Sequence, residues 1–373
     1  MDNIKSKNNL WQTVKKYCPK FSFVFFSLFL LAAVVHITCL LSEGFADFYN
    51  QTGGAFVRAV LAYLTRLLPF SLAETIIIGM PFIVAGLIYV SIKQMKNSDE
   101  AGVRCIVGLF SVLTFMYSIF VLGYGMGYHG TSLASKLSLD EKEVSAEELK
   151  VTAEALLEEL DMVLDEIAYD GKGVSAMPYS LNEMNAKLNS TYKIMAEKYG
   201  FIQNLNSKLK YIVLSEPMTY THISGVYSYY TGEANLNINF PDYTLPFTAA
   251  HELAHQRGIA PENEANFVAF LVCCESDDPY IRYSGYLNMF EYVTNALYTA
   301  SSDMYYEVMS NTDSRAKKEM IAYSEFFDKY RESVASDVSD AVNNTYLKTQ
   351  GQSAGTASYG MVVDLAVAYY KQK

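Results

Sequence analysis

The segment Phe247–Phe270 reads "FTAAHELAHQRGIAPENEANFVAF" and holds two of the five histidines of the chain. His251 and His255 are spaced so that, on a helix, they lie one turn apart on the same face, and both imidazoles can reach a single ion. Glu252 lies between them, where its carboxylate can act as the general base for a water molecule. This H-E-x-x-H arrangement is typical of zinc peptidases, and it predicts a helix with one buried face and one face turned to a metal site.

The residues after this motif can supply the missing ligand. Two histidines leave a zinc site one protein ligand short, and the acidic stretch "ENEAN" follows after Gly258, which can reverse the chain, and Pro261, which can start a new helix. Glu262 and Glu264 compete for the role. We favour Glu262, because Asn266 lies one turn further along the same face and could hydrogen-bond a metal-binding histidine. Glu264 remains the alternative.

The flanking sequence predicts a mainly helical, α+β domain with a small sheet. Ser145 with Glu148, and Ser180 with Glu183, form capping-box patterns that open two helices. The segment Ala234–Phe240, "ANLNINF", alternates polar and apolar residues and reads as a strand just before the motif, placed like the edge strand with which zincins pair an extended substrate. Towards the C-terminus we expect one long charged helix from about Ser314 to Val342.

The composition indicates a lipid-embedded part beside an acidic, water-facing part. The chain has 373 residues, of which 51% are hydrophobic, with a formal net charge of -11. Three apolar runs, Phe21–Leu41, Ser71–Ile92 and Val103–Met126, each approach the roughly 20 residues that cross a bilayer as a helix. The first run is too long for a removable signal peptide and is interpreted as a retained anchor.

The basic residues predict the orientation in the cell membrane. Five lysines accompany one aspartate in the first 20 residues, and the second connection between the apolar runs carries Lys93, Lys96 and Arg104. The first connection is longer but carries only Arg58 and Arg66. The positive-inside rule therefore places the N-terminus in the cytoplasm and the C-terminal domain outside. The expected parts are a cytoplasmic basic head (1–20), a membrane region with three transmembrane helices (21–128) and an extracytoplasmic zincin-like domain (129–373).

Four segments give the chain a family resemblance: "SGVYSYYTGEANLNI", "LPFTAAHELAHQRGIAPENEANFVAF", "YSGYLNMFEYV" and "SYGMVVDL". They resemble the bacterial membrane proteins grouped as domain of unknown function 3810, which have "HELAHQRG" followed by "EDEANF" or close variants. The resemblance implies an N-terminal group of membrane helices and a zincin-like metallopeptidase domain, but no substrate. Asn263 removes one charge from the acidic motif. Asn266 stands where many zincins have aspartate, which leaves the surroundings of the ligands less charged.

The expected function is therefore that of a membrane-anchored, Zn²⁺-dependent metallopeptidase that cuts peptides or proteins outside the cytoplasmic membrane. The alternative is a catalytically silent zincin-like domain that binds an envelope component or a partner protein. The intact Glu252 favours the enzyme, because a binding module needs no general base beside its histidines. Proteolysis within the membrane is not favoured, because the stretch around His251 is too polar for a membrane helix.

The remaining expectations concern partners and the residue that stabilises an oxyanion. The bilayer and a peptide or protein substrate are the expected partners, and the acidity of the domain argues against nucleic acid. The oligomeric state is left open. Of the other histidines, only His222 is placed to reach the site as an oxyanion donor. Six tyrosines are further candidates, and the sequence singles out none of them: Tyr227, Tyr229, Tyr230, Tyr283, Tyr286 and Tyr359.

Overall fold

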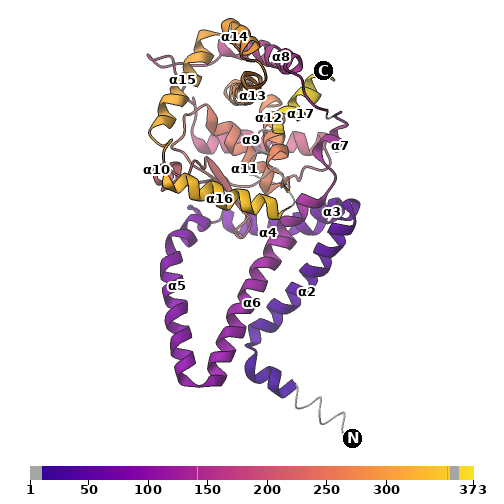
Figure 1. The fold of residues 1–373 in the computed structure, drawn as a ribbon, viewed down its shortest axis with the longest axis vertical. Coiled ribbons are helices and arrows are strands. Elements are labelled where there is room, and N and C mark those ends of the chain that lie inside the picture. Colours follow the sequence, from indigo (N-terminus) through magenta and orange to yellow (C-terminus); the bar gives the residue numbers. More distant parts are fainter. Residues whose placement is uncertain (1–10, 141, 351, 353–360) are drawn as a thin grey trace.

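The computed structural model describes residues 11–373 except 141, 351 and 353–360, and it has two parts. A rounded helical domain lies at one end, and long helices extend from it towards the N-terminus (Figure 1). Three of these helices are long and apolar enough to cross a membrane: α2 (Lys20–Leu41), α5 (Leu72–Asn97) and α6 (Asp99–Gly123). They coincide with the three apolar runs of the sequence, and together they indicate association with a membrane.

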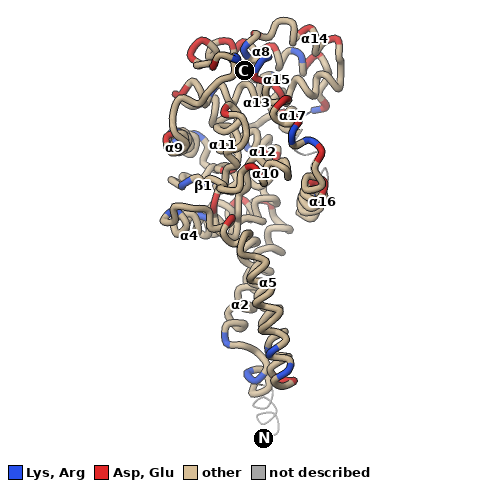
Figure 2. The backbone as a smooth tube through the Cα atoms, turned by 90° about the vertical axis from the view of Figure 1, so that its left-hand side faces the viewer, with Lys and Arg blue, Asp and Glu red and all other residues tan. Residues whose placement is uncertain are grey.

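The charged residues lie at the ends of the long helices and on the domain. Figure 2 shows a group of mainly basic residues at the end near the N-terminus and residues of both charges on the domain, whereas the middle of the long helices carries none. The 18-residue apolar window of α5 has no buried residue, so its side chains are available to lipid. The orientation across the membrane remains a prediction from the lysine distribution.

Short helices from the membrane part lie under the domain. They are α3 (Glu43–Tyr49), the π-helix η1 (Asn50–Gly54), α4 (Ala55–Arg66) and, after α6, the 3₁₀-helix η2 (Gly125–His129). α4 buries Arg58 and exposes Phe56 and Leu64 on other sides. The start of α5 is tied to the domain as well, because the Glu233 carboxylate accepts hydrogen bonds from the backbone N–H groups of Leu72 and Ala73. The two parts therefore share an extensive polar contact.

Eleven helices of the described residues build the domain around the buried helix α13 (Figure 1). They are α7 (Leu133–Leu137), α8 (Ala146–Leu164), α9 (Leu181–Lys198), α10 (Ser215–Thr219), α11 (Thr244–Gln256), α12 (Glu262–Cys274), α13 (Pro279–Ala300), α14 (Ser302–Asn311), α15 (Ser314–Asp328), α16 (Val334–Thr349) and α17 (Val362–Tyr370). The capping boxes predicted at Ser145 and Ser180 are both present, and they open α8 and α9.

The small sheet differs from the prediction. Its strands are β1 (Lys210–Tyr211), β2 (Gly225–Ser228) and β3 (Glu233–Leu236), in the order β1-β3-β2. The prediction of an edge strand over Ala234–Phe240 is wrong, because β3 ends at Leu236 and lies in the centre, parallel to β1 and antiparallel to β2. Beyond it, the side chain of Asn237 donates to Thr219 and to the carbonyl of Ile223. β1 and β2 are the two edge strands of the sheet.

A second prediction is also wrong: the structure has two helices where one long helix was expected from Ser314 to Val342. α15 ends at Asp328 and α16 starts at Val334. Between them, Tyr330 is buried against Phe326 and Tyr220, and the side chain of Ser333 caps the N-terminus of α16. Burial of this tyrosine and a good N-cap outweigh the continuous helical periodicity of the sequence.

Candidate metal centre

Helices α11 and α12 bring three of the predicted residues together. His251 and His255 lie on α11, and Glu262 is the first residue of α12. The Oε2 atom of Glu262 is 3.2 Å from Nε2 of His251 and 3.3 Å from Nε2 of His255. All three donor atoms lie within 4.8 Å of one another, and all three side chains are buried. The H-x-x-x-H spacing thus acts as expected, with both imidazoles on one face of a helix.

A tight turn makes this convergence possible. Gly258 has a φ of 93°, a left-handed conformation that glycine adopts without strain. Its N–H donates to the carbonyl of His255, and the N–H of Ile259 donates to that of Ala254, so the last carbonyls of α11 are satisfied. A Cβ atom at position 258 would come within 2.5 Å of the Arg58 guanidinium. Pro261 then serves as the N-cap of α12, directly before Glu262.

Glu262 and Glu264, the two candidates for the third ligand, make different contacts. The carboxylate of Glu264 accepts a hydrogen bond of 2.8 Å from the backbone N–H of Leu133, outside the cluster of donors. Asn266 lies one turn after Glu262, buried beside His251. The Nδ1 atom of His251 and the Nδ2 atom of Asn266 are buried without a hydrogen-bond partner among the described residues. Turning the amide of Asn266 over would present its oxygen to an N–H at Nδ1.

Tyr124, which follows α6, contacts the imidazole of His255. Tyr124 is not among the residues that the sequence predicted for the site. The Nδ1 atom of His255 is 2.7 Å from the carbonyl of Ile259 and 3.0 Å from the hydroxyl of Tyr124, which lies 3.3 Å from the carbonyl of Ala260. Because a carbonyl only accepts hydrogen bonds, Nδ1 carries the proton and Nε2 faces Glu262. Such contacts fix the tautomer and the ring orientation of a metal-binding histidine.

The donor set fits a zinc ion. Two ligands at about 2.0–2.1 Å from a tetrahedral ion are separated by about 3.3 Å, and the two Nε2–Oε2 distances are 3.2 and 3.3 Å. Two imidazole nitrogens and one carboxylate oxygen are ligands that zinc accepts, and three protein ligands leave one position open, as in catalytic sites. Glu252 is buried next to the cluster, and its Oε2 atom has no hydrogen-bond partner within the described part of the chain.

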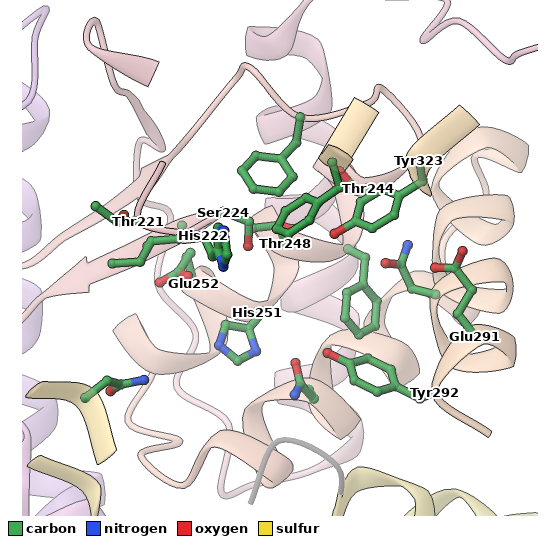
Figure 3. A pocket seen from close by; sticks show the side chains of 18 of the residues that line it. Thr221, His222, Ser224, Thr244, Thr248, His251, Glu252, Glu291, Tyr292 and Tyr323 are labelled. Atoms are coloured by element: carbon green, nitrogen blue, oxygen red, sulfur yellow. The ribbon is translucent and has the colours of Figure 1, made fainter. Parts of the chain in front are cut away.

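A cavity of about 480 Å³ opens beside these residues. Figure 3 shows Glu252 and His251 at one end of it, and Glu291, Tyr292 and Tyr323 at the other. The segment leading into β2 forms the wall at the Glu252 end. A Cβ atom on Gly225 would lie 2.5 Å from Oε1 of Glu252, so only glycine lets the strand backbone come so close to this carboxylate.

Comparison with known proteins places this geometry in a family. Residues 49–367 match the family described as "Protein of unknown function (DUF3810)". The chain belongs to this family. No curated protein and no solved structure matches this DUF3810 protein. The match includes η1, α4, both long helices α5 and α6, and the cluster of His251, His255 and Glu262, and the family description states no activity.

In this DUF3810 protein, His251, His255 and Glu262 shift one another's pKa values. Burial disfavours charge on Glu262, but the two histidines outweigh it and lower the pKa of Glu262 below its usual range. Burial likewise opposes charge on His255, while the neighbouring Glu262 raises the pKa of His255 to about 9. Burial and the charge of His255 lower the pKa of His251. His255 and Glu262 therefore form a buried ion pair.

Glu252 behaves differently from Glu262, although both are buried carboxylates. Burial raises the pKa of Glu252 to about 8. A carboxyl group whose pKa lies near neutral pH can both take up and release a proton in one reaction cycle. The site thus contains one carboxylate that stays charged, Glu262, and one that can gain or lose a proton near neutral pH, Glu252.

The expected oxyanion donors lie elsewhere or are occupied. His222 lines the cavity, but its Nε2 atom is 2.7 Å from the carbonyl of Tyr330 and must donate to it, so the neutral ring has no second N–H for a substrate. Of the six tyrosines, Tyr359 lies outside the described residues, and the other five are not among the residues that line the cavity. The tyrosines that do line it are Tyr292 and Tyr323.

Proposed function

We propose that this DUF3810 protein is a membrane-anchored zinc metallopeptidase that hydrolyses peptide bonds outside the cytoplasmic membrane. The observation that carries the proposal is the convergence of His251, His255 and Glu262 at the end of a cavity that also contains Glu252. A zincin-like site of this kind needs three protein donors, an open position and a general base, and the four residues meet these requirements.

The residues of the chain have distinct roles in this proposal. His251, His255 and Glu262 would hold the ion, which supplies a Lewis acid that activates water at neutral pH and polarises a carbonyl group. Glu252 takes a proton from the water and gives it to the leaving amine, a transfer that its pKa of about 8 suits. Asn266, with its amide turned over, would orient His251, and Tyr124 orients His255.

The edge of the sheet offers a place for the substrate backbone. Residues Ile223, Ser224 and Gly225 line the cavity, and they lead into the edge strand β2. An extended peptide can pair with such an edge through main-chain hydrogen bonds. Its scissile bond would then lie near Glu252, because Gly225 lies directly against that carboxylate.

The location follows from the lysine distribution and the three apolar helices, with the N-terminus in the cytoplasm and the domain outside. A reporter enzyme that is active only outside the cytoplasm, fused after Lys373, tests this orientation. Activity of the fusion supports it. A well-expressed but silent fusion contradicts it.

The activity test uses the full chain in detergent, because Arg58 and Tyr124 of the membrane part contact the site. The parent protein, loaded with zinc, should hydrolyse members of a fluorescence-quenched peptide library. Glu252→Gln should retain about one zinc ion per chain and lose at least about a hundredfold in rate. Glu325→Gln, a change on the exposed surface of α15, is the matched control and should match the parent.

Two results would overturn the proposal. If the purified parent protein binds no ion, the H-E-x-x-H motif has only a structural role. A stoichiometric ion without any hydrolysis above that of Glu252→Gln would instead support the alternative, a domain that binds an envelope component or a partner protein without cutting it.

A further inference from the structure

We propose that the far end of the cavity binds a positively charged group of the substrate, and that Glu291 is the residue that recognises it. This inference rests on the proposed peptidase function for its substrate class. The shared chemistry is a protonated amine or a guanidinium, carried by a lysine or arginine side chain or by the amino terminus of a peptide.

Glu291 belongs to a polar face on a helix that is otherwise buried. Four residues of α13 line the cavity, namely Asn288, Glu291, Tyr292 and Asn295, and their spacing puts them on one side of the helix. Most other positions along the middle of α13 are buried in the core. Figure 3 shows Glu291 at the end of the cavity away from Glu252. The helix thus presents a carboxylate to the space that a substrate side chain would enter.

Within the described part of the chain, this carboxylate has a neutral partner and no cation. The hydroxyl of Tyr243 donates to its two oxygens at 3.1 and 3.3 Å. A carboxylate can accept about four hydrogen bonds, so most of its capacity is unused. The described residues that line the cavity include no Lys or Arg, whereas Asp340 on α16 adds a third carboxylate to those of Glu252 and Glu291. Largely desolvated carboxylates are normally paired with a cation, and here the cation is left for a ligand to provide.

The electrostatic surroundings agree with this reading of the geometry. Burial raises the pKa of Glu291 to about 7, and the nearby Glu319 adds to the effect. A bound cation would restore the ionised form. The hydrogen bond from Tyr243 does not require the charge, because the amide oxygen of a glutamine can accept it equally well. Glu291→Gln therefore removes the charge and keeps the local hydrogen bond.

The test measures binding in the Glu252→Gln background, so that peptides are not consumed. The probes are fluorescent, amino-acetylated peptides that differ at one position by lysine, arginine, norleucine or glutamate, each also made with a free amino terminus. We expect the best lysine or arginine peptide to bind at least about tenfold more tightly than its norleucine counterpart, as a hydrogen bond between charged groups predicts. Adding Glu291→Gln should reduce this preference to less than about twofold without weakening the norleucine peptide. Adding Glu325→Gln should leave it unchanged.

Each outcome has a defined meaning. If the preference follows the free amino terminus, the recognised group is the α-amine, and if it follows the side chain, the group is lysine or arginine. Equal affinities for the lysine and norleucine peptides, no binding of any peptide, or a preference that persists in Glu291→Gln would overturn the inference. Hydrolysis by the parent without a charge preference contradicts the inference alone. A charge preference that depends on Glu291, without hydrolysis, contradicts the peptidase proposal alone.

Discussion

The cavity has two walls that are built in opposite ways. The wall of α11 and α12 takes its three candidate metal donors from the short stretch His251–Glu262, and all three side chains are buried. The opposite wall of α13, α15 and α16 gathers residues from Asn288 to Asn343, and several of them are solvent-accessible. Donors for an ion must keep their geometry within fractions of an ångström, whereas contacts to a substrate side chain tolerate adjustment.

The difference also concerns charge. On the first wall, the charge of Glu262 is balanced by the protonated His255. On the opposite wall, Glu291 has a neutral tyrosine as its partner. Under the two proposals, the first wall would hold the metal ion, and the second would receive its balancing charge from a ligand.

The largest effect is expected from the two neighbouring glutamates of the metal wall. Glu262→Ala should lower zinc affinity by more than about a hundredfold, because even the loss of a residue that merely orients a ligand costs about 10- to 100-fold. Glu264→Ala should retain the ion, because the Glu264 carboxylate accepts a hydrogen bond from Leu133 outside the cluster of donors. Zinc titration of both variants tests this prediction, together with their melting temperatures measured with and without a chelator. If Glu264→Ala empties the site and Glu262→Ala does not, the assignment is reversed.

The turn between α11 and α12 should be the next most sensitive feature. Gly258→Ala forces a side chain into a φ of 93° and against Arg58, and we expect a loss of about 2 kcal/mol in stability. Gly171→Ala is the control, since a Cβ atom there meets nothing within 4 Å. Thermal unfolding of the two full-length variants measures the difference. Equal melting temperatures would mean that the metal wall does not depend on this turn.

On the opposite wall, Glu291 should give stability a pH dependence. Because its folded pKa, about 7, is above the unfolded value of about 4.3, the folded state binds more protons in this interval and stability falls as the pH rises from about 4 to 7. Glu291→Gln should remove this contribution. At pH 8 the free energy of unfolding of the variant should exceed that of the parent by about 1.5 kcal/mol, with little difference at pH 4. This is less than the roughly 3.7 kcal/mol that the pKa difference alone would give, because Glu291 is only partly buried and solvent screens its charge. Unfolding curves at both pH values test the sign, and a less stable variant at pH 8 would contradict it.

The smallest effect concerns the contact between the metal wall and the membrane part. Tyr124→Phe removes the hydroxyl beside His255 but keeps the ring, and the hydrogen bond to Ile259 remains. We expect about a tenfold loss of zinc affinity with a nearly unchanged melting temperature. Tyr128→Phe, one turn away at the same border, should leave zinc affinity unchanged. Identical zinc affinities for the parent and Tyr124→Phe would show that the carbonyl of Ile259 orients His255 without help.

The sequence by itself determined the features that depend on neighbouring residues. Helical spacing placed His251 and His255 on one face, the apolar runs specified three long helices, and capping boxes opened α8 and α9. The preference for Glu262 over Glu264 rested on the same periodicity, and the structure places Glu262 beside both histidines. These features follow from backbone geometry over one or two turns, which short stretches of sequence encode.

Only the tertiary structure decided what distant segments do together. Tyr124 reaches His255 because the end of α6 packs under the turn, and Gly225 approaches Glu252 because β2 packs against α11. The polar face of α13 is visible in the spacing of Asn288, Glu291 and Asn295, but nothing in that spacing says which cavity it lines. The pairing of strands and the break at Tyr330 were mispredicted for the same reason: they depend on burial against residues remote in the chain, and local periodicity carries no information about such contacts.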